Sequence, residues 1–229
     1  MKARQGTLRT GGALLALAGT ALLAGCHRGE LVALETIAPS VRQQMRYAGS
    51  ANFVGAPIDG YRAPRCWLAE PAARALAGAQ AEAAAEGLTL LVYDCYRPKR
   101  AVRHFVRWAA SDDQATKEDY YPRVSKRELL LHGYVAEPSA HSRGSTVDVT
   151  LARPCNGGVV PLDMGTRHDF FDPSAHYAST EVTPLQRANR RRLRELMERH
   201  GFRAYDAEWW HFTLADEPYP DRQFDVPIE

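Results

Sequence analysis

The chain has 229 residues, of which 45% are hydrophobic and 24% charged, and its formal net charge is +2. This length suits one domain with a real core and is too short for two. The near-neutral charge argues against a strongly basic nucleic-acid-binding surface, so we expect no nucleic-acid partner.

The N-terminal segment has the pattern of an export signal. Basic residues precede an apolar run over residues 11–24, which is too short to span a bilayer well and ends just before Cys26 in a sequence that resembles the bacterial lipobox. We therefore predict a lipoprotein signal peptide over residues 1–25, a lipid-anchored linker over 26–45 and a catalytic domain over 46–229. Because residue 27 is not Asp, we expect an exported bacterial lipoprotein held at the outer membrane and facing the periplasm. An ordinary secretory signal with a chance cysteine is the alternative.

The rest of the chain alternates helical and strand patterns without regular repetition. Pro71 suits the first turn of a helix, and Gly87 and Gly201 suit positions just after helix ends. Helices are predicted over residues 71–86, 98–110, 123–131 and 184–200, and strands over 88–95, 145–151 and 209–214. Residues 31–61, 112–121 and 154–180 have a loop-like composition. This mixed order favours an α+β fold.

Three cysteines follow the predicted lipid attachment site: Cys66, Cys95 and Cys155. Export would place them where disulfides persist, and an odd number leaves at least one unpaired. Cys95 and Cys155 each adjoin a strand that should border the candidate site, so we expect this pair to be the disulfide. None of the three has the spacing of a zinc ligand.

The first candidate metal ligands lie in residues 139–148, which contain His141 and Asp148. Asp148 falls on the polar face of the predicted strand 145–151, and Gly144 permits a turn that folds His141 back toward it. Two imidazoles and one carboxylate can hold a zinc ion with one coordination position open. The alternative is that Asp148 is a structural carboxylate and His141 a loop histidine.

A second run, Glu208–Trp–Trp–His211, supplies another imidazole and a carboxylate. A fully extended strand would send Glu208 and His211 to opposite faces, so Glu208 must lie at a bend if both serve one metal ion. Glu208 could then act as the base for an activated water, while the two tryptophans are predicted to be core residues. Arg97, at the end of an apolar strand, could stabilise an oxyanion; a surface arginine is the alternative.

These runs resemble the VanX-type D-alanyl-D-alanine dipeptidases of zinc peptidase family M15, subfamily D. The resemblance covers nearly all of the mature chain and includes the motifs YRPKRAV at 96–102, HSRGS at 141–145 and EWWH at 208–211. Further matches lie at residues 47–48, 52–55, 59–61, 108–110, 121–122, 133–136, 164–165, 189–193 and 216–220. It implies a single domain with a central antiparallel sheet flanked by helices, of the Hedgehog/D,D-peptidase type.

The resemblance also implies a role for each site residue. It makes His141, Asp148 and His211 the ligands of one zinc ion per subunit, Glu208 the general base and then acid, and Arg97 the stabiliser of the tetrahedral intermediate. It places Asp169 at the substrate ammonium, with Tyr47 and Ser139 as further substrate contacts. The chain departs from the pattern at Cys95, where Gly is common, at His168, where an aromatic residue is expected, and at Ala140, where Ser is common.

The sequence is therefore compatible with three functions. Hydrolysis of the dipeptide D-Ala-D-Ala is the preferred one, in salvage of dipeptide released during cell-wall turnover, because an exported lipoprotein cannot act in the cytoplasm. A D,D-carboxypeptidase acting on peptidoglycan stems would use the same metal and base but needs a cleft that is open at the amine side. A zinc-binding module without catalysis is disfavoured by the joint presence of Glu208 and Arg97. The expected partners are a dipeptide and, through the lipid, a membrane; the oligomeric state stays open.

Overall fold

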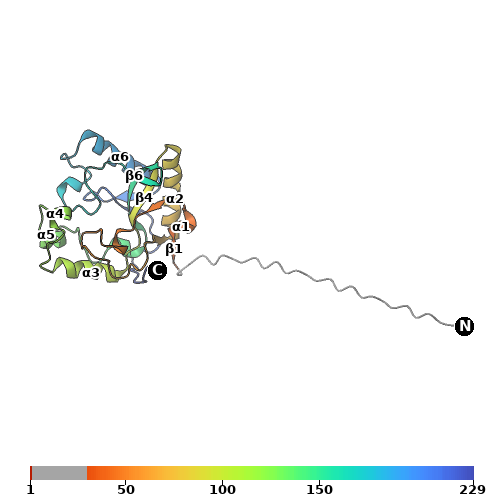
Figure 1. Cartoon of the computed structure of the whole chain (residues 1–229), viewed down its shortest axis with the longest axis horizontal. Helices are drawn as coiled ribbons and strands as arrows, with labels where there is room; N and C mark the ends of the chain where they lie inside the picture. The colour runs from red at the N-terminus through yellow and green to blue at the C-terminus, as the bar shows by residue number, and fades with distance from the viewer. Residues whose placement is uncertain (2–29) are drawn as a thin grey trace.

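The computed structural model describes residue 1 and residues 30–229 (Figure 1). A six-stranded sheet lies at the centre of the fold. The strands are β2 (Arg42–Gln43), β4 (Thr89–Asp94), β5 (Thr146–Cys155), β6 (Gly158–Pro161), β7 (Phe202–Ala204) and β8 (His211–Leu214). Their order is β2-β4-β5-β8-β7, with β6 also paired to β5, and only the β2–β4 pair is parallel. The expected α+β domain with a central, largely antiparallel sheet is confirmed.

The alternating pattern of β5 decides which face of the sheet is covered by helices. Val147, Val149 and Leu151 belong to the larger hydrophobic core, together with residues of α2 (Glu70–Ala85) and α6 (Pro184–Arg199). Asp148 points to the other face, as the alternation predicts. That face is not solvated, since residues 146–152 are all buried.

A second, aromatic core lies beyond the face that carries Asp148. It gathers Tyr47, Phe53, Phe105, Trp108 and Phe171. Its helical elements are η1 (Arg46–Ala48), α3 (Lys99–Ala109), α4 (Lys117–Tyr120) and α5 (Lys126–Leu131). Polar side chains of the sheet therefore lie between two hydrophobic cores, where water is scarce and charges must be paired.

The longer helices are confirmed at the boundaries that their capping signals predict. Pro71 lies in the first turn of α2, and α6 begins with a capping box between Thr183 and Gln186. Gly87 and Gly201, just beyond the two helices, have positive φ angles of 72° and 83°. The predicted helices at 98–110 and 123–131 correspond to α3 and α5, and α4 is one turn in the predicted polar loop.

The prediction of a loop over residues 31–61 is wrong at its start, because residues 31–43 contain two short strands and one helical turn. Leu31, Val32 and Ala33 form β1 (Leu31–Ala33), which is fully buried and pairs with β3 (Trp67–Ala69). α1 (Leu34–Ile37) and β2 follow directly. Strands of two or three residues are too short for a periodic signal, so the sequence pattern indicated only a loop there. β7, with three residues, was missed for the same reason, and β6, with four, lies in a segment whose glycines and proline indicated a loop.

The predicted signal peptide and the lipid attachment at Cys26 lie outside the residues that the structure describes. Within residues 30–229, none of the helices combines the length and the apolar character needed to cross a membrane.

The disulfide joins Cys66 to Cys95, with Cα atoms 5.3 Å apart, so the predicted Cys95–Cys155 pair is wrong. β4 and β5 are antiparallel, and Cys95 follows Asp94, which pairs with Asp148, whereas Cys155 lies three residues beyond Ala152, the partner of Thr89. The two cysteines are thus at opposite ends of the strand pair. Cys66 is brought to Cys95 because the backbone N–H of Tyr96 donates to the carbonyl of Trp67, at 2.9 Å. Cys155 is a free, exposed thiol.

Removing this disulfide with the double substitution Cys66→Ala and Cys95→Ala should lower the free energy of unfolding by about 3–4 kcal/mol. The cysteines are 29 residues apart, and a cross-link of that span restricts the unfolded chain by roughly this amount. Urea unfolding of the oxidised protein measures the change. Cys155→Ser is the matched control and should stay within about 0.5 kcal/mol of wild type. Equal stability of the double variant and wild type would contradict the prediction.

Candidate active site

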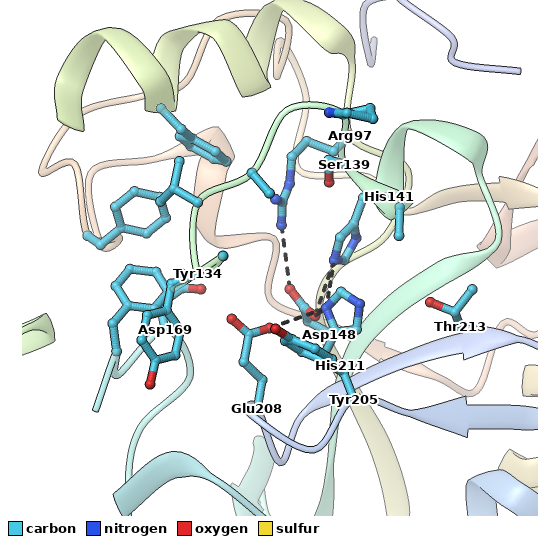
Figure 2. Close-up of a pocket in the computed structure, with 18 of the residues that line it drawn as sticks. Arg97, Tyr134, Ser139, His141, Asp148, Asp169, Tyr205, Glu208, His211 and Thr213 are labelled. Carbon is cyan, nitrogen blue, oxygen red and sulfur yellow. Dashed lines mark hydrogen bonds and ion pairs between the residues drawn. The ribbon is translucent and has the colours of Figure 1, made fainter. Parts of the chain in front are cut away.

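His141, Asp148 and His211 converge at one point on the polar face of the sheet (Figure 2). Asp148 on β5 is directly opposite His211 on β8 in the strand register. His141 lies in η2 (Ala140–Arg143), which ends at Gly144 with φ 78°, and the turn folds the imidazole back toward β5 as predicted. His141 Nε2 and His211 Nδ1 each lie 3.3 Å from Asp148 Oδ1.

These three side chains fit a divalent metal ion. Their ligand atoms all lie within 4.8 Å of one another, and Asp148 Oδ1 is buried without a hydrogen-bond partner among the described residues. His141 Nδ1 donates to the carbonyl of Cys95 at 2.7 Å, which leaves Nε2 as the lone-pair nitrogen that faces the site. Two imidazoles and a carboxylate with one side open form the donor set of a catalytic metal site.

Charges around the cluster favour the ligand forms of His141 and Asp148. Burial lowers the pKa of His141, and the charge of Arg97 lowers it further, so the neutral imidazole is preferred. Burial alone would raise the pKa of Asp148, but His141, His168 and His211 hold it well below its ordinary value. Burial also lowers the pKa of His211, yet Asp148 and Glu208 outweigh it and raise this pKa to about 9. His211 is therefore protonated at neutral pH when no metal is bound, and a metal ion at this position would take the place of that proton.

Glu208 lies at a bend before the last strand, as the sequence required. β8 begins at His211, whose backbone N–H donates to the carbonyl of Glu208 at 3.2 Å. Glu208 Oε2 is 3.3 Å from His211 Nδ1, and the carboxylate faces the cavity (Figure 2). The predicted core role of Trp209 and Trp210 is confirmed, since both belong to the larger hydrophobic core.

Arg97 is held by Asp94, which was not among the predicted site residues. The Nε of Arg97 donates to Asp94 Oδ2 at 2.9 Å, and its Nη2 lies 3.7 Å from Asp148 Oδ2. Asp94 is completely buried and also accepts a 2.6 Å hydrogen bond from the hydroxyl of Tyr61. An irregularity in the β4–β5 register after Val92 places Asp94 opposite Asp148. A lone carboxylate at the end of an apolar strand, three residues before Arg97, was the signal available in the sequence.

Asp169 and Tyr47 meet at the inner end of the site, although 122 residues separate them. The hydroxyl of Tyr47 lies 3.1 and 3.0 Å from the two carboxylate oxygens of Asp169. Asp169 is the one residue other than glycine with a positive φ, 62°, among the described residues, a strained conformation that is typical of functional sites. Burial raises the pKa of Asp169 to about 6, although His168 acts in the opposite direction.

A cavity of about 360 Å³ joins these groups and is large enough for a small ligand. Arg97, His141, Asp148, Glu208 and His211 line it together with Asp169, Tyr47 and Ser139, so every predicted site residue that the structure describes borders it. Aromatic side chains form much of the remaining wall: Phe53, Phe105, Tyr134, Phe171 and Tyr205. Tyr134 and Tyr205 were not among the predicted site residues, because no local pattern in the sequence marks them as part of a site.

The amino-acid sequence of the chain is similar to those of known proteins. Residues 27–229 match a peptidase family M15 model described as D-ala-D-ala dipeptidase. A D-alanyl-D-alanine dipeptidase of Enterococcus faecium is 46% identical over 197 residues, which cover 86% of this chain and 96% of the relative. A protein of the same name from Streptomyces coelicolor is 42% identical over 87% of this chain and 98% of its own length. One from Escherichia coli is 35% identical over 81% of this chain and 84% of its own length.

Proposed function

Because the chain belongs to the D-alanyl-D-alanine dipeptidase family of M15 metallopeptidases, we propose that it hydrolyses D-alanyl-D-alanine to two molecules of D-alanine. As a member of this family the chain is an enzyme, a metal-dependent hydrolase. The observation that carries the proposal is the convergence of three ligand atoms, Glu208 and Arg97 on one cavity.

We propose zinc as the metal, one ion per subunit, held by His141, Asp148 and His211. When bound, zinc lowers the pKa of a water molecule toward neutrality and polarises a carbonyl group. Asp148 Oδ1 and the two imidazole nitrogens provide the borderline donor set that suits this ion.

Glu208 is the proposed proton carrier in both halves of the reaction. Its carboxylate, 3.3 Å from His211 and facing the cavity, accepts a proton from the attacking water. The water oxygen forms a bond to the scissile carbonyl carbon, and the guanidinium of Arg97 stabilises the negative charge that develops on the carbonyl oxygen. Glu208 then returns the proton to the amide nitrogen as the C–N bond breaks, which releases D-alanine.

The surroundings of Asp169 favour a dipeptide as the substrate over the end of a longer peptide. Asp169 would bind the substrate ammonium, with Tyr47 fixing its carboxylate and Ser139 as a further substrate contact. Asp169 is 4% exposed, and Phe53 and Phe171 beside it are each 2% exposed. A peptide chain that continued past the ammonium would meet this buried wall.

We also propose that the substrate comes from cell-wall turnover, outside the cytoplasm. This proposal is supported by the export-signal pattern over residues 1–25 and the lipobox-like sequence at Cys26. Cell fractionation and mass spectrometry of the mature N-terminus test it. A lipid-free protein in the cytoplasm would overturn it.

Release of D-alanine from D-Ala-D-Ala and from a stem pentapeptide ending in the same pair tests the dipeptidase proposal. The zinc-loaded protein should cleave the dipeptide and spare the pentapeptide, and removal of zinc by a chelator should abolish release. Cleavage of the pentapeptide would indicate a carboxypeptidase with an open cleft. If the zinc-loaded protein released no D-alanine from either peptide, the chain would be a binding module without catalysis.

The KM for D-Ala-D-Ala should rise about tenfold per pH unit below pH 6. Asp169, with its pKa of about 6, is a carboxylate above that pH and becomes neutral below it, whereas the substrate amine, with a pKa of about 8, stays charged. The ion pair is therefore lost on the acidic side. Steady-state kinetics from pH 5 to 8 measure the change. Asp169→Asn is the control and should show a high KM without this rise; the same rise in that variant would contradict the assignment.

A further inference from the structure

His168 lies buried between two carboxylates that belong to different parts of the site. Its Nε2 is 3.1 Å from Asp148 Oδ2, and its Nδ1 is 3.3 Å from Asp169 Oδ2. The side chain is 4% exposed and is absent from the wall of the catalytic cavity. Since an ionised carboxylate only accepts hydrogen bonds, Nε2 donates to Asp148, while Nδ1 and Asp169 form an ion pair when the ring is protonated. His168 thus touches both functional carboxylates without reaching the substrate space.

The ring is fixed in this position by aromatic packing. It stacks on Tyr93 with centroids 4.9 Å apart and an interplanar angle of 29°, and it meets the Trp210 ring edge-on at 5.4 Å. A ring held from two sides has little freedom to turn, so its two nitrogens give fixed positions to the carboxylates.

The contact with His168 gives the two carboxylate oxygens of Asp148 different partners. Oδ1 faces His141 and His211, each at 3.3 Å, while Oδ2 faces His168. A donor on Oδ2 decides which oxygen turns toward the metal position, which is how second-shell groups orient a ligand.

A second cation shared by Asp148, His168 and Asp169 is a less satisfactory explanation of the cluster, although their ligand atoms lie within 4.8 Å of one another. The two carboxylates approach different nitrogens of the ring rather than one common point. The 3.1 Å contact is already a hydrogen-bond distance and leaves no space for an ion between the two atoms.

We propose that His168 is a positioning residue that couples the metal ligand Asp148 to the ammonium-binding carboxylate Asp169. Through it, the placement of one carboxylate depends on the other, so metal affinity and substrate binding are linked. The part concerning the ammonium rests on the proposed dipeptidase function. The part concerning the metal rests only on the contacts of His168.

A double-mutant cycle on metal affinity tests the coupling without any assay of activity. Zinc dissociation constants are measured by competition with a chromophoric chelator for wild type, His168→Phe, Asp169→Asn and the double variant. His168→Phe should weaken zinc binding about 10- to 100-fold, the usual effect of losing a second-shell partner. Asp169→Asn should also weaken it, by a factor at least three times larger in wild type than in the His168→Phe background. Unchanged affinity in His168→Phe, or effects that simply multiply, would overturn the proposal.

Two further variants separate the effect of the hydrogen bond from that of packing. His168→Gln keeps one donor and should recover part of the zinc affinity lost in His168→Phe; equal loss in both variants would contradict a donated hydrogen bond. His200→Phe is the matched control, because His200 faces Glu82 at 2.8 Å outside the cavity, and its zinc affinity should equal that of wild type. Thermal unfolding of each variant verifies that it is folded.

Kinetics of the zinc-saturated His168→Phe variant give the second readout. KM for D-Ala-D-Ala should rise about tenfold or more while kcat changes less, because Asp169 is displaced and the reacting groups remain. A fall in kcat alone would contradict the link to Asp169. If the wild type itself fails to hydrolyse the dipeptide, the proposed function fails, while the zinc-affinity cycle still decides the role of His168.

Discussion

Glu208→Gln should lower kcat for D-Ala-D-Ala by about 10³- to 10⁴-fold, with KM within a few-fold of wild type. The amide has the size of the carboxylate but accepts no proton, and one group serves both proton transfers in the proposed reaction, which places the loss at the upper end of the range for general acid–base catalysis. D-alanine release under single-turnover and steady-state conditions measures the effect. Zinc content should be unchanged, because Glu208 is outside the proposed ligand set.

Asp206→Asn is the matched control for this substitution. Asp206 precedes Glu208 in the same bend, but its side chain is 80% exposed and pairs with Arg194 at 2.7 Å. The control should keep wild-type kcat within about twofold, as is usual for a surface substitution. A Glu208→Gln variant that stayed within tenfold of wild type would mean that another group carries the proton.

Arg97→Met should lower kcat/KM by about 10²- to 10³-fold and, separately, destabilise the fold by about 3–5 kcal/mol. The kinetic loss follows from removing a preorganised cation beside the reacting carbonyl. The loss of stability follows from Asp94, which is completely buried and would be left as an unpaired charge. Kinetics and urea unfolding measure the two effects independently.

The double substitution Arg97→Met and Asp94→Asn distinguishes the two effects. A neutral amide at position 94 needs no cation, so stability should recover while kcat/KM stays low. Recovery of activity together with stability would mean that Arg97 acts only by holding the fold. Arg107→Met, on the helix α3 that follows Arg97, is the control: the Arg107 side chain is 60% exposed and pairs with Asp59, and both quantities should stay near wild type.

The helices and the proposed ligands were predictable because their signals are local. Capping residues mark α2 and α6, and His141, Gly144 and Asp148 lie within one turn and strand. The required bend at Glu208 followed from strand geometry alone. Asp169 and Tyr47 were found only through the family resemblance, because no local pattern relates residues 122 positions apart.

What the sequence pattern missed depends on pairing between distant segments. β1 and β3 are three residues each, and they form a strand pair only because they are neighbours in space. The disulfide was assigned to the wrong partner because the choice between Cys66 and Cys155 depends on the direction of β5 relative to β4. Asp94 was missed because its orientation depends on an irregularity in strand register.

That irregularity makes the chemistry sensitive to the length of one strand. Leu90 and Val92 point into the larger core, so regular alternation would send Asp94 there too, but the shift after Val92 turns it to face Asp148 instead. Tyr93 is the extra residue, and its ring stacks on His168, so the irregularity that turns Asp94 toward Asp148 also supplies an aromatic contact of His168. A chain shortened by this one residue would lose that contact of His168, although regular pairing would still leave Asp94 opposite Asp148.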